Sequence, residues 1–189
     1  MASNFDFVDV VVADRDLVVT NSGDHVRRLE PRQSALAWYC DLDDGTPTGD
    51  TDPASFVRWV CPALRVGGPA TDATIPQVEV RRPGPHSDLG KLLKAFSSLV
   101  GRHTPSEVEG RFAYTDPAGI LDVELRRRIE NWPSALHGDG VVRPAELWSI
   151  TRTAEGLVVG SVSWWGSAEA LDHQIGLALD IAHRLLAQR

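Results

Sequence analysis

The chain closes with an apolar hairpin that runs directly into an amphipathic helix, and this unit constrains the fold more than any other part of the sequence. Its two strand segments, Glu146–Arg152 and Leu157–Trp165, are rich in β-branched and aromatic residues, and the residues between them end in glycine, as hairpin turns do. Ser167 can cap a helix, after which apolar residues recur at helical spacing, at Leu171, Ile175, Ala178, Ala182 and Leu185. We therefore expect an antiparallel hairpin covered by a long C-terminal helix.

Alternation of apolar and polar residues predicts further strands in the first half of the chain. The segments concerned are Phe5–Val12, Leu17–Thr20, Val26–Glu30, Ser34–Cys40, Ser55–Cys61 and Thr74–Arg82. The first two are expected to pair as a hairpin, and so are the fourth and fifth. An alternative for the fifth makes Asp52 a cap and Pro53 the first residue of a short helix to Val60.

Two more helices are expected in the second half. One begins at Ser87 or Asp88 and ends at Gly101, and the other follows Asp116–Pro117, turns Leu121, Leu125, Ile129 and Trp132 inward, and stops at Pro133. The sum is an α+β fold, a largely antiparallel sheet built from hairpins with about three helices packed on it. We expect one domain over 1–189, with a looser N-terminal hairpin portion over 1–33.

Composition excludes several classes of protein. The net charge of −7 and the pI near 5.3 argue against a nucleic-acid partner, since binding to phosphate backbones depends on clustered Lys and Arg. No apolar run is long enough for a membrane span and no signal peptide is visible, so we expect a cytoplasmic protein without a membrane role. Cys40 and Cys61 form no CxxC pair and are expected at opposite ends of their hairpin, as buried free thiols.

The acidic loop 41–52 is the best candidate for a cation site, because its aspartates could supply the oxygen ligands that calcium prefers. It does not fit the EF-hand pattern: Gly45 stands where Asp or Asn is wanted and Thr46 stands where glycine is required. A solvated connection between strands is the simpler interpretation. We therefore expect no metal and no cofactor, and leave open whether the loop binds a cation.

Other residues that could carry chemistry have simpler structural explanations. His86, Ser87 and Asp88 bring a base, a hydroxyl and a carboxylate together, but the latter two suit helix capping and no Gly-x-Ser-x-Gly motif occurs. The arginines Arg126–Arg128 should fan around a helix as a solvated face, too spread to clasp one phosphate. His173 and His183 are expected to be two solvated histidines on one helix.

The run Ile75–Pro83, the segment Gly110–Pro117 with the helix Leu121–Trp132, and the final hairpin and helix resemble an uncharacterised family of bacterial domains common in actinobacteria. The pattern of that family is a Pro-x-hydrophobic-x-Val strand, which this chain matches at Pro76–Val80, a Phe-x-Val-x-x-x-Asp strand leading to a helix, and a hairpin. The resemblance covers about residues 35 to 187. It implies the same fold and brings no activity or catalytic residues.

Trp164 and Trp165 are the residues that point most directly to a binding surface. Adjacent strand residues face opposite sides of a sheet, so these two indoles cannot both enter one core. We expect a non-catalytic interaction or regulatory protein with a protein partner or a second copy of itself. The alternatives are a small-molecule-binding protein or cryptic enzyme, with a Trp-lined pocket and His86, Asp88 or His103 nearby, and an acidic inhibitor that mimics nucleic acid.

Overall fold

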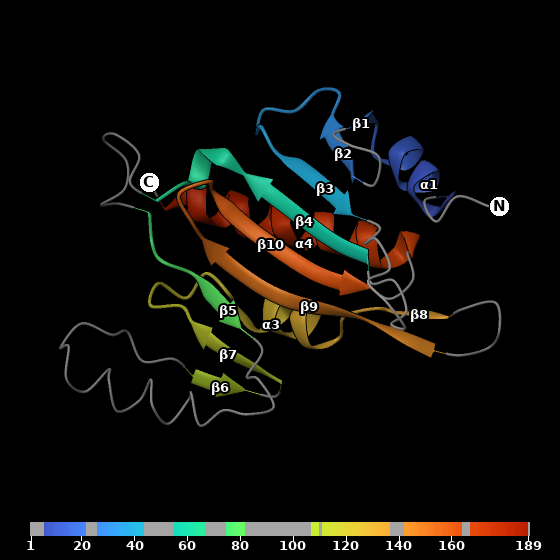
Figure 1. The fold of residues 1–189 in the computed structure, drawn as a ribbon. Coiled ribbons are helices and arrows are strands. Elements are labelled where there is room, and N and C mark those ends of the chain that lie inside the picture. The colour runs from blue at the N-terminus through green and yellow to red at the C-terminus, as the bar shows by residue number, and fades with distance from the viewer. Residues whose placement is uncertain are drawn as a thin grey trace.

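The computed structural model describes residues 6–21, 26–43, 55–66, 75–81, 107–109, 111–136, 142–163 and 167–188. Its strands pair antiparallel in the order β1-β2-β3-β4-β10-β9-β5-β7-β6, with β8 beside β9, and helices lie against this sheet (Figure 1). The strands are β1 (Leu17–Asn21), β2 (Val26–Pro31), β3 (Tyr39–Asp43), β4 (Ser55–Cys61), β5 (Glu79–Arg81), β6 (Glu107–Glu109), β7 (Phe112–Thr115), β8 (Ser134–Leu136), β9 (Val142–Arg152) and β10 (Leu157–Ser163). The predicted α+β fold is confirmed.

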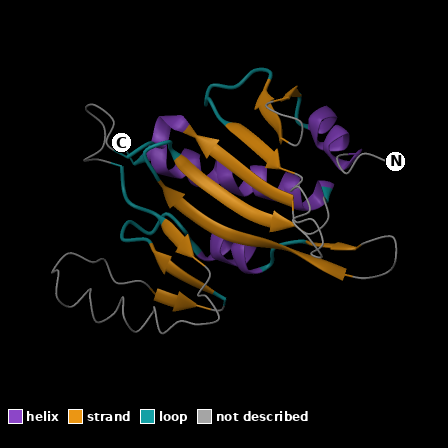
Figure 2. Ribbon diagram, viewed as in Figure 1, coloured by secondary structure: helices purple, strands orange, loops and turns teal. Residues whose placement is uncertain are grey.

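The long C-terminal helix α4 (Ala168–Ala187) crosses behind the central strands β4 and β10, with α1 (Asp6–Asp14) and α3 (Val123–Glu130) beside it (Figure 2). The Ser167 hydroxyl accepts a hydrogen bond from the Ala170 N–H at 3.3 Å, which confirms the predicted cap. The five residues of the predicted apolar stripe are all buried; they are Leu171, Ile175, Ala178, Ala182 and Leu185. The core therefore lies between α4 and the sheet.

One buried polar contact joins α4 to the sheet. The Ser161 hydroxyl on β10 donates to Oε1 of Gln174 at 2.6 Å, and Nε2 of Gln174 donates to the carbonyls of Val57 and Val159 at 3.2 and 2.9 Å. The β9–β10 register shifts between Gly160 and Ser161, so these bonds lie beside the irregularity. Because each polar atom has a partner, the contact fixes how the helix sits on the strands without leaving a buried group unsatisfied.

The expected N-terminal hairpin is wrong. Residues 6–14 form the helix α1, which buries Val8 and Val11 against β1 and α4, and β1 pairs instead with β2. The N-terminal portion 1–33 is therefore a helix followed by a hairpin, and β1 becomes the last strand of the sheet. The short strand expected at Val26–Glu30 is confirmed as β2.

The antiparallel pairing of β3 with β4 confirms the hairpin expected between the segments Ser34–Cys40 and Ser55–Cys61. The alternative helix ending at Val60 is wrong. However, β3 begins only at Tyr39, so Cys40 lies opposite Trp59, two residues from Cys61. The two cysteines therefore lie at the same end of the pair and not at opposite ends; both are buried, and no disulfide joins them. Trp59 also stacks on Trp38, with ring centroids 5.8 Å apart, so these indoles fill the core.

The segment before α3 forms a turn in place of the expected first helical residues. The carboxylate of Asp116 accepts from the N–H groups of Ile120 and Leu121, and Asp122 caps the helix by accepting from Leu125 at 3.0 Å. The predicted inward residues are buried nevertheless, as Leu121, Leu125, Ile129 and Trp132. The strand expected over 74–82 is present as β5, and the helix expected from Ser87 or Asp88 to Gly101 lies outside the described residues.

No helix in the described ranges is long and apolar enough to cross a membrane.

Candidate functional site

Trp164, Trp165, His86 and Asp88 lie outside the described residues, and so do His103 and positions 44–52 of the acidic loop. The first aspartates of that loop belong to β3, where the Arg28 guanidinium donates to both carboxylate oxygens of Asp41 at 2.6 and 2.9 Å. Within the described part of the chain, no group of three or more His, Cys, Asp or Glu side chains is placed to hold a metal ion.

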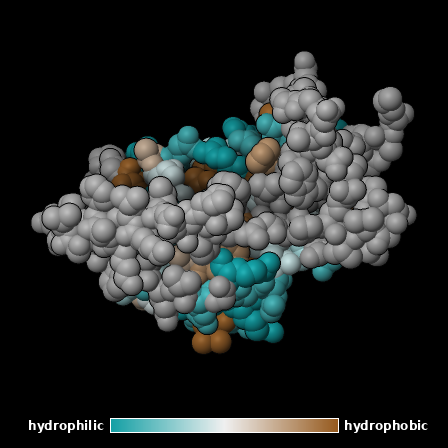
Figure 3. Space-filling model, turned by 60° about the horizontal axis from the view of Figure 1, so that its bottom comes forward, coloured by the Kyte–Doolittle hydropathy of each residue, from teal (hydrophilic) through white to brown (hydrophobic). Residues whose placement is uncertain are grey.

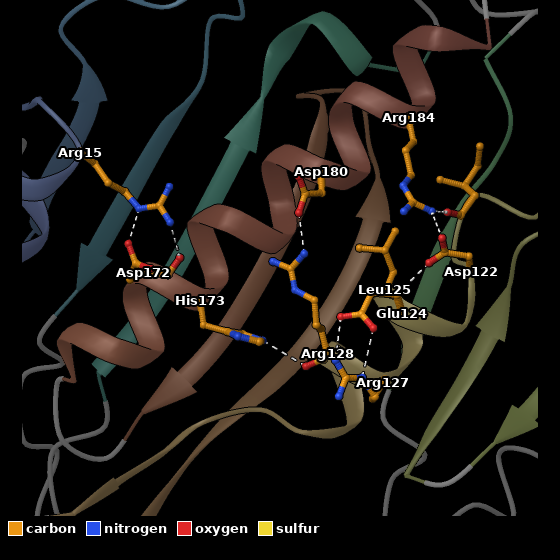
Figure 4. Close-up of polar contacts among 11 residues, drawn as sticks. Arg15, Asp122, Glu124, Leu125, Arg127, Arg128, Asp172, His173, Asp180 and Arg184 are labelled. Atoms are coloured by element: carbon orange, nitrogen blue, oxygen red, sulfur yellow. Dashed lines mark hydrogen bonds and ion pairs between the residues drawn. The ribbon is translucent and has the colours of Figure 1, made fainter.

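Ion pairs tie the three helices together on the side away from the sheet (Figure 4). Arg15, in the turn between α1 and β1, pairs with Asp172 of α4 and also donates to the Asp172 carbonyl at 3.0 Å. Arg128 of α3 pairs with Asp180 of α4 at 2.5 Å. The side chain of each arginine is 27% exposed and that of each aspartate is 51% exposed. The guanidinium groups are thus the sheltered members of these pairs.

The arginines Arg126–Arg128 fan out to three different carboxylates, as predicted. Arg126 pairs with Glu109 at 2.8 Å, and Arg127 pairs with Glu124 at 2.8 Å. The expected solvated face is correct only for Arg127, which is 65% exposed, because Arg126 and Arg128 reach across to other elements and are 22% and 27% exposed. Two of the three arginines therefore hold the tertiary structure.

His173 is half-buried, which corrects the expectation of two solvated histidines; His183 is exposed as expected. The imidazole stands edge-on to the Trp132 indole, with ring centroids 5.0 Å apart, and its Nε2 lies 3.0 Å from the Arg128 carbonyl. A carbonyl can only accept, so Nε2 carries the proton in the neutral ring. Burial, reinforced by the charge of Arg128 and opposed by this hydrogen bond, lowers the pKa of His173.

This lowered pKa predicts a loss of stability in acid. In the unfolded chain His173 binds a proton at about pH 6.5, whereas in the folded chain it binds one only at a lower pH. The free energy of unfolding is therefore highest above about pH 6.5 and falls as the pH drops toward the folded pKa. Chemical denaturation at about pH 7.5 and about pH 5 should show a smaller drop for His173→Gln than for the natural chain. His183→Gln is the matched control on the same helix, and an equal effect of both variants would contradict this assignment.

Strand β1 is a free edge of the sheet. It lies at one end of the strand order, and within the described ranges it pairs only with β2. Its sequence, Leu-Val-Val-Thr-Asn, has no charge and no proline. Val19 is 36% exposed, and Val10 of the adjoining helix α1 is 54% exposed. Val19 is therefore an exposed apolar side chain on the edge strand itself.

Exposed hydrophobic side chains are otherwise scattered. The remaining large ones are Phe56, Val66 and Val123, which belong to three separate parts of the described chain. On the face shown in Figure 3, the described surface is mainly hydrophilic and its hydrophobic atoms form small separate patches. That face offers no broad apolar docking surface among the described residues, so the β1 edge is the stronger candidate.

The sequence reasoning missed this edge because it paired β1 with residues 5–12. The signal that could have found it is the spacing of Phe7, Val8, Val11 and Val12, which suits one face of a helix as well as it suits alternation. Comparisons with protein-family models, with curated proteins and with solved structures found no match.

Proposed function

We propose that this protein is a non-catalytic interaction or regulatory protein that associates with a second copy of itself through the edge of β1. The observation that carries the proposal is the uncharged edge strand β1, which pairs only with β2 among the described residues and carries the exposed Val19. We also propose a cytoplasmic location. It is supported by Cys40 and Cys61, which lie near one end of the same strand pair and are not joined by a disulfide, as suits a reducing compartment.

The two edges of the sheet differ in a way that supports this proposal. Proteins usually protect edge strands with charges, prolines or covering elements. The opposite edge, β6, reads Glu-Val-Glu and carries two carboxylates over three residues, whereas β1 carries no charge over five. Because each copy carries a net charge of −7, two copies repel one another, and a neutral strand is where that repulsion is weakest. Identical strands can pair antiparallel about a two-fold axis.

The direct test is Val19→Lys. The side chain is partly exposed and lies on the edge strand, so the substitution places a charge where two copies would meet while the stem of lysine can still cover Leu29, its partner on β2. Sedimentation equilibrium should show a weak dimer of the natural chain, with a dissociation constant on the order of 10 μM, and at least about a tenfold weaker one for the variant.

The matched control is Val123→Lys, which places the same charge on an 84% exposed valine of α3. This variant should dimerise like the natural chain, and circular dichroism should show all three proteins folded. A natural chain that stays monomeric at a concentration on the order of 100 μM would contradict the proposal, and so would equal dimerisation of the Val19→Lys variant.

The second candidate, a small-molecule-binding protein or cryptic enzyme, has one specific feature in its favour. Arg15 and Arg128 approach one another over α4, and neither uses all of its hydrogen-bond donors on described residues. Binding of a ligand there can be tested separately from dimerisation.

A further inference from the structure

Two guanidinium groups from distant parts of the sequence, those of Arg15 and Arg128, both come close to Gly176 of α4. A methyl group at Gly176 would lie 3.2 Å from Nη2 of Arg15 and 3.5 Å from Nη2 of Arg128. The two nitrogens are therefore separated by no more than the sum of these distances. Like charges this close repel, so the arrangement gains most from an acceptor that contacts both.

Both arginines keep donors that no described residue uses. A guanidinium has five N–H donors. Arg15 donates through Nε and Nη2 to Asp172, and Arg128 donates through Nη1 to Asp180. Among the described residues, Nη1 of Arg15 and both Nε and Nη2 of Arg128 have no hydrogen-bond acceptor. Nη2 of Arg128, beside Gly176, is therefore open to an acceptor, and Nη2 of Arg15, also beside Gly176, uses one of its two N–H groups on the Asp172 carbonyl.

Glycine at this position is explained by the space it leaves. Gly176 lies inside a twenty-residue helix, where glycine is less favourable than alanine, and it has no left-handed φ that would require it. A Cβ there would be in tight contact with Nη2 of Arg15 at 3.2 Å and in ordinary van der Waals contact with Nη2 of Arg128 at 3.5 Å. The missing Cβ lets the two guanidinium groups approach the helix surface and leaves a notch between them.

We propose that Arg15 and Arg128 bind a small oxyanion, carried by a single phosphate or carboxylate group, in the notch over Gly176. Two oxygens of one such group, each about 2.8 Å from one Nη2 atom, can bridge the separation between the two Nη2 atoms. Planar guanidinium groups also match oxyanions with paired hydrogen bonds. Asp172 and Asp180 pair with the arginines and stay half exposed, so each guanidinium is held in place while its Nη2 lies near Gly176. This site is independent of the proposed dimer edge.

The test is a titration of the natural chain with inorganic phosphate, and separately with acetate, followed by the arginine Nε–H signals in NMR spectra. The signals of Arg15 and Arg128 should shift together, with a dissociation constant on the order of 1 mM for at least one of the two anions. Arg128→Gln should weaken binding at least about tenfold, whereas Arg127→Gln, the neighbouring exposed arginine, should leave it unchanged.

The variant Gly176→Ala should change anion binding without lowering the stability of the fold. The methyl group fills the notch, so binding should be lost, while the unfolding free energy should stay the same or rise because alanine favours the helix. The proposal is overturned if neither anion shifts the two signals, if Arg127→Gln weakens binding as much as Arg128→Gln does, or if Gly176→Ala binds normally.

Discussion

Gly156→Ala should lower the free energy of unfolding by about 3 to 5 kcal/mol, the largest effect expected of any substitution considered for this protein. Gly156 is buried at the end of the β9–β10 turn with φ +144°, and a Cβ there would lie 2.1 Å from the carbonyl oxygen of Cys61 and 3.0 Å from Cα of Pro62. Backbone atoms cannot turn aside as a flexible side chain can. The variant must therefore separate the hairpin turn from the end of β4, and urea denaturation would measure the loss.

The matched control is Gly119→Ala. Gly119 also has a positive φ, +66°, but nothing lies within 4 Å of a Cβ built there. Only the backbone strain of a left-handed residue remains, so the expected loss is about 1 kcal/mol. If both variants lose the same free energy of unfolding, the close approach to Cys61 is not the reason why Gly156 is needed.

Arg152→Ala should lower the free energy of unfolding by about 3 kcal/mol, the second largest effect. The Arg152 guanidinium, at the end of β9, donates to four backbone carbonyls, at 3.0 Å to Leu64, 2.8 Å to Ile75, 3.3 Å to Pro76 and 3.4 Å to Arg65. Removing it leaves partly buried carbonyls without this donor in two separate segments. Arg152→Lys should recover only part of the stability, because a single ammonium cannot reach all four oxygens.

Arg127→Ala serves as the control for this prediction. Arg127 is exposed on α3 and, among the residues that the structure describes, pairs only with Glu124, three residues before it, so its removal should leave the denaturation midpoint unchanged. Arg152 does not stabilise the fold by joining η1 (Pro62–Leu64) to the residues before β5 if the Arg152→Ala variant is as stable as the Arg127→Ala control.

The C-terminal unit could be predicted from the sequence because its signals are local and agree with one another. The Ser167 cap, the apolar stripe of α4 and the glycine-ended turn before Leu157 each lie within a few residues of the structure they specify. The helix α1 could not be predicted in the same way. Its valines favour a strand locally, and packing of Val8 and Val11 against α4, far along the chain, outweighs that preference.

The features of the candidate sites depend on contacts between distant residues, so sequence reasoning missed them. His173 is half-buried because Trp132 and the Arg128 carbonyl meet it from α3 and its end. Arg15 and Arg128 are more than a hundred positions apart and come together only over α4. The one local signal was Gly176, a glycine inside a sequence that otherwise favours helix strongly.

Amide hydrogen exchange at β1 reports directly on whether two copies associate through this strand. If two copies pair along this edge, the amides of residues 17–21 that point away from β2 should exchange more slowly as the protein concentration rises, while the amides of β6 at the opposite edge should not change. Val19→Lys should remove this dependence on concentration. Exchange at β1 that is fast and the same at every concentration would contradict association through this strand.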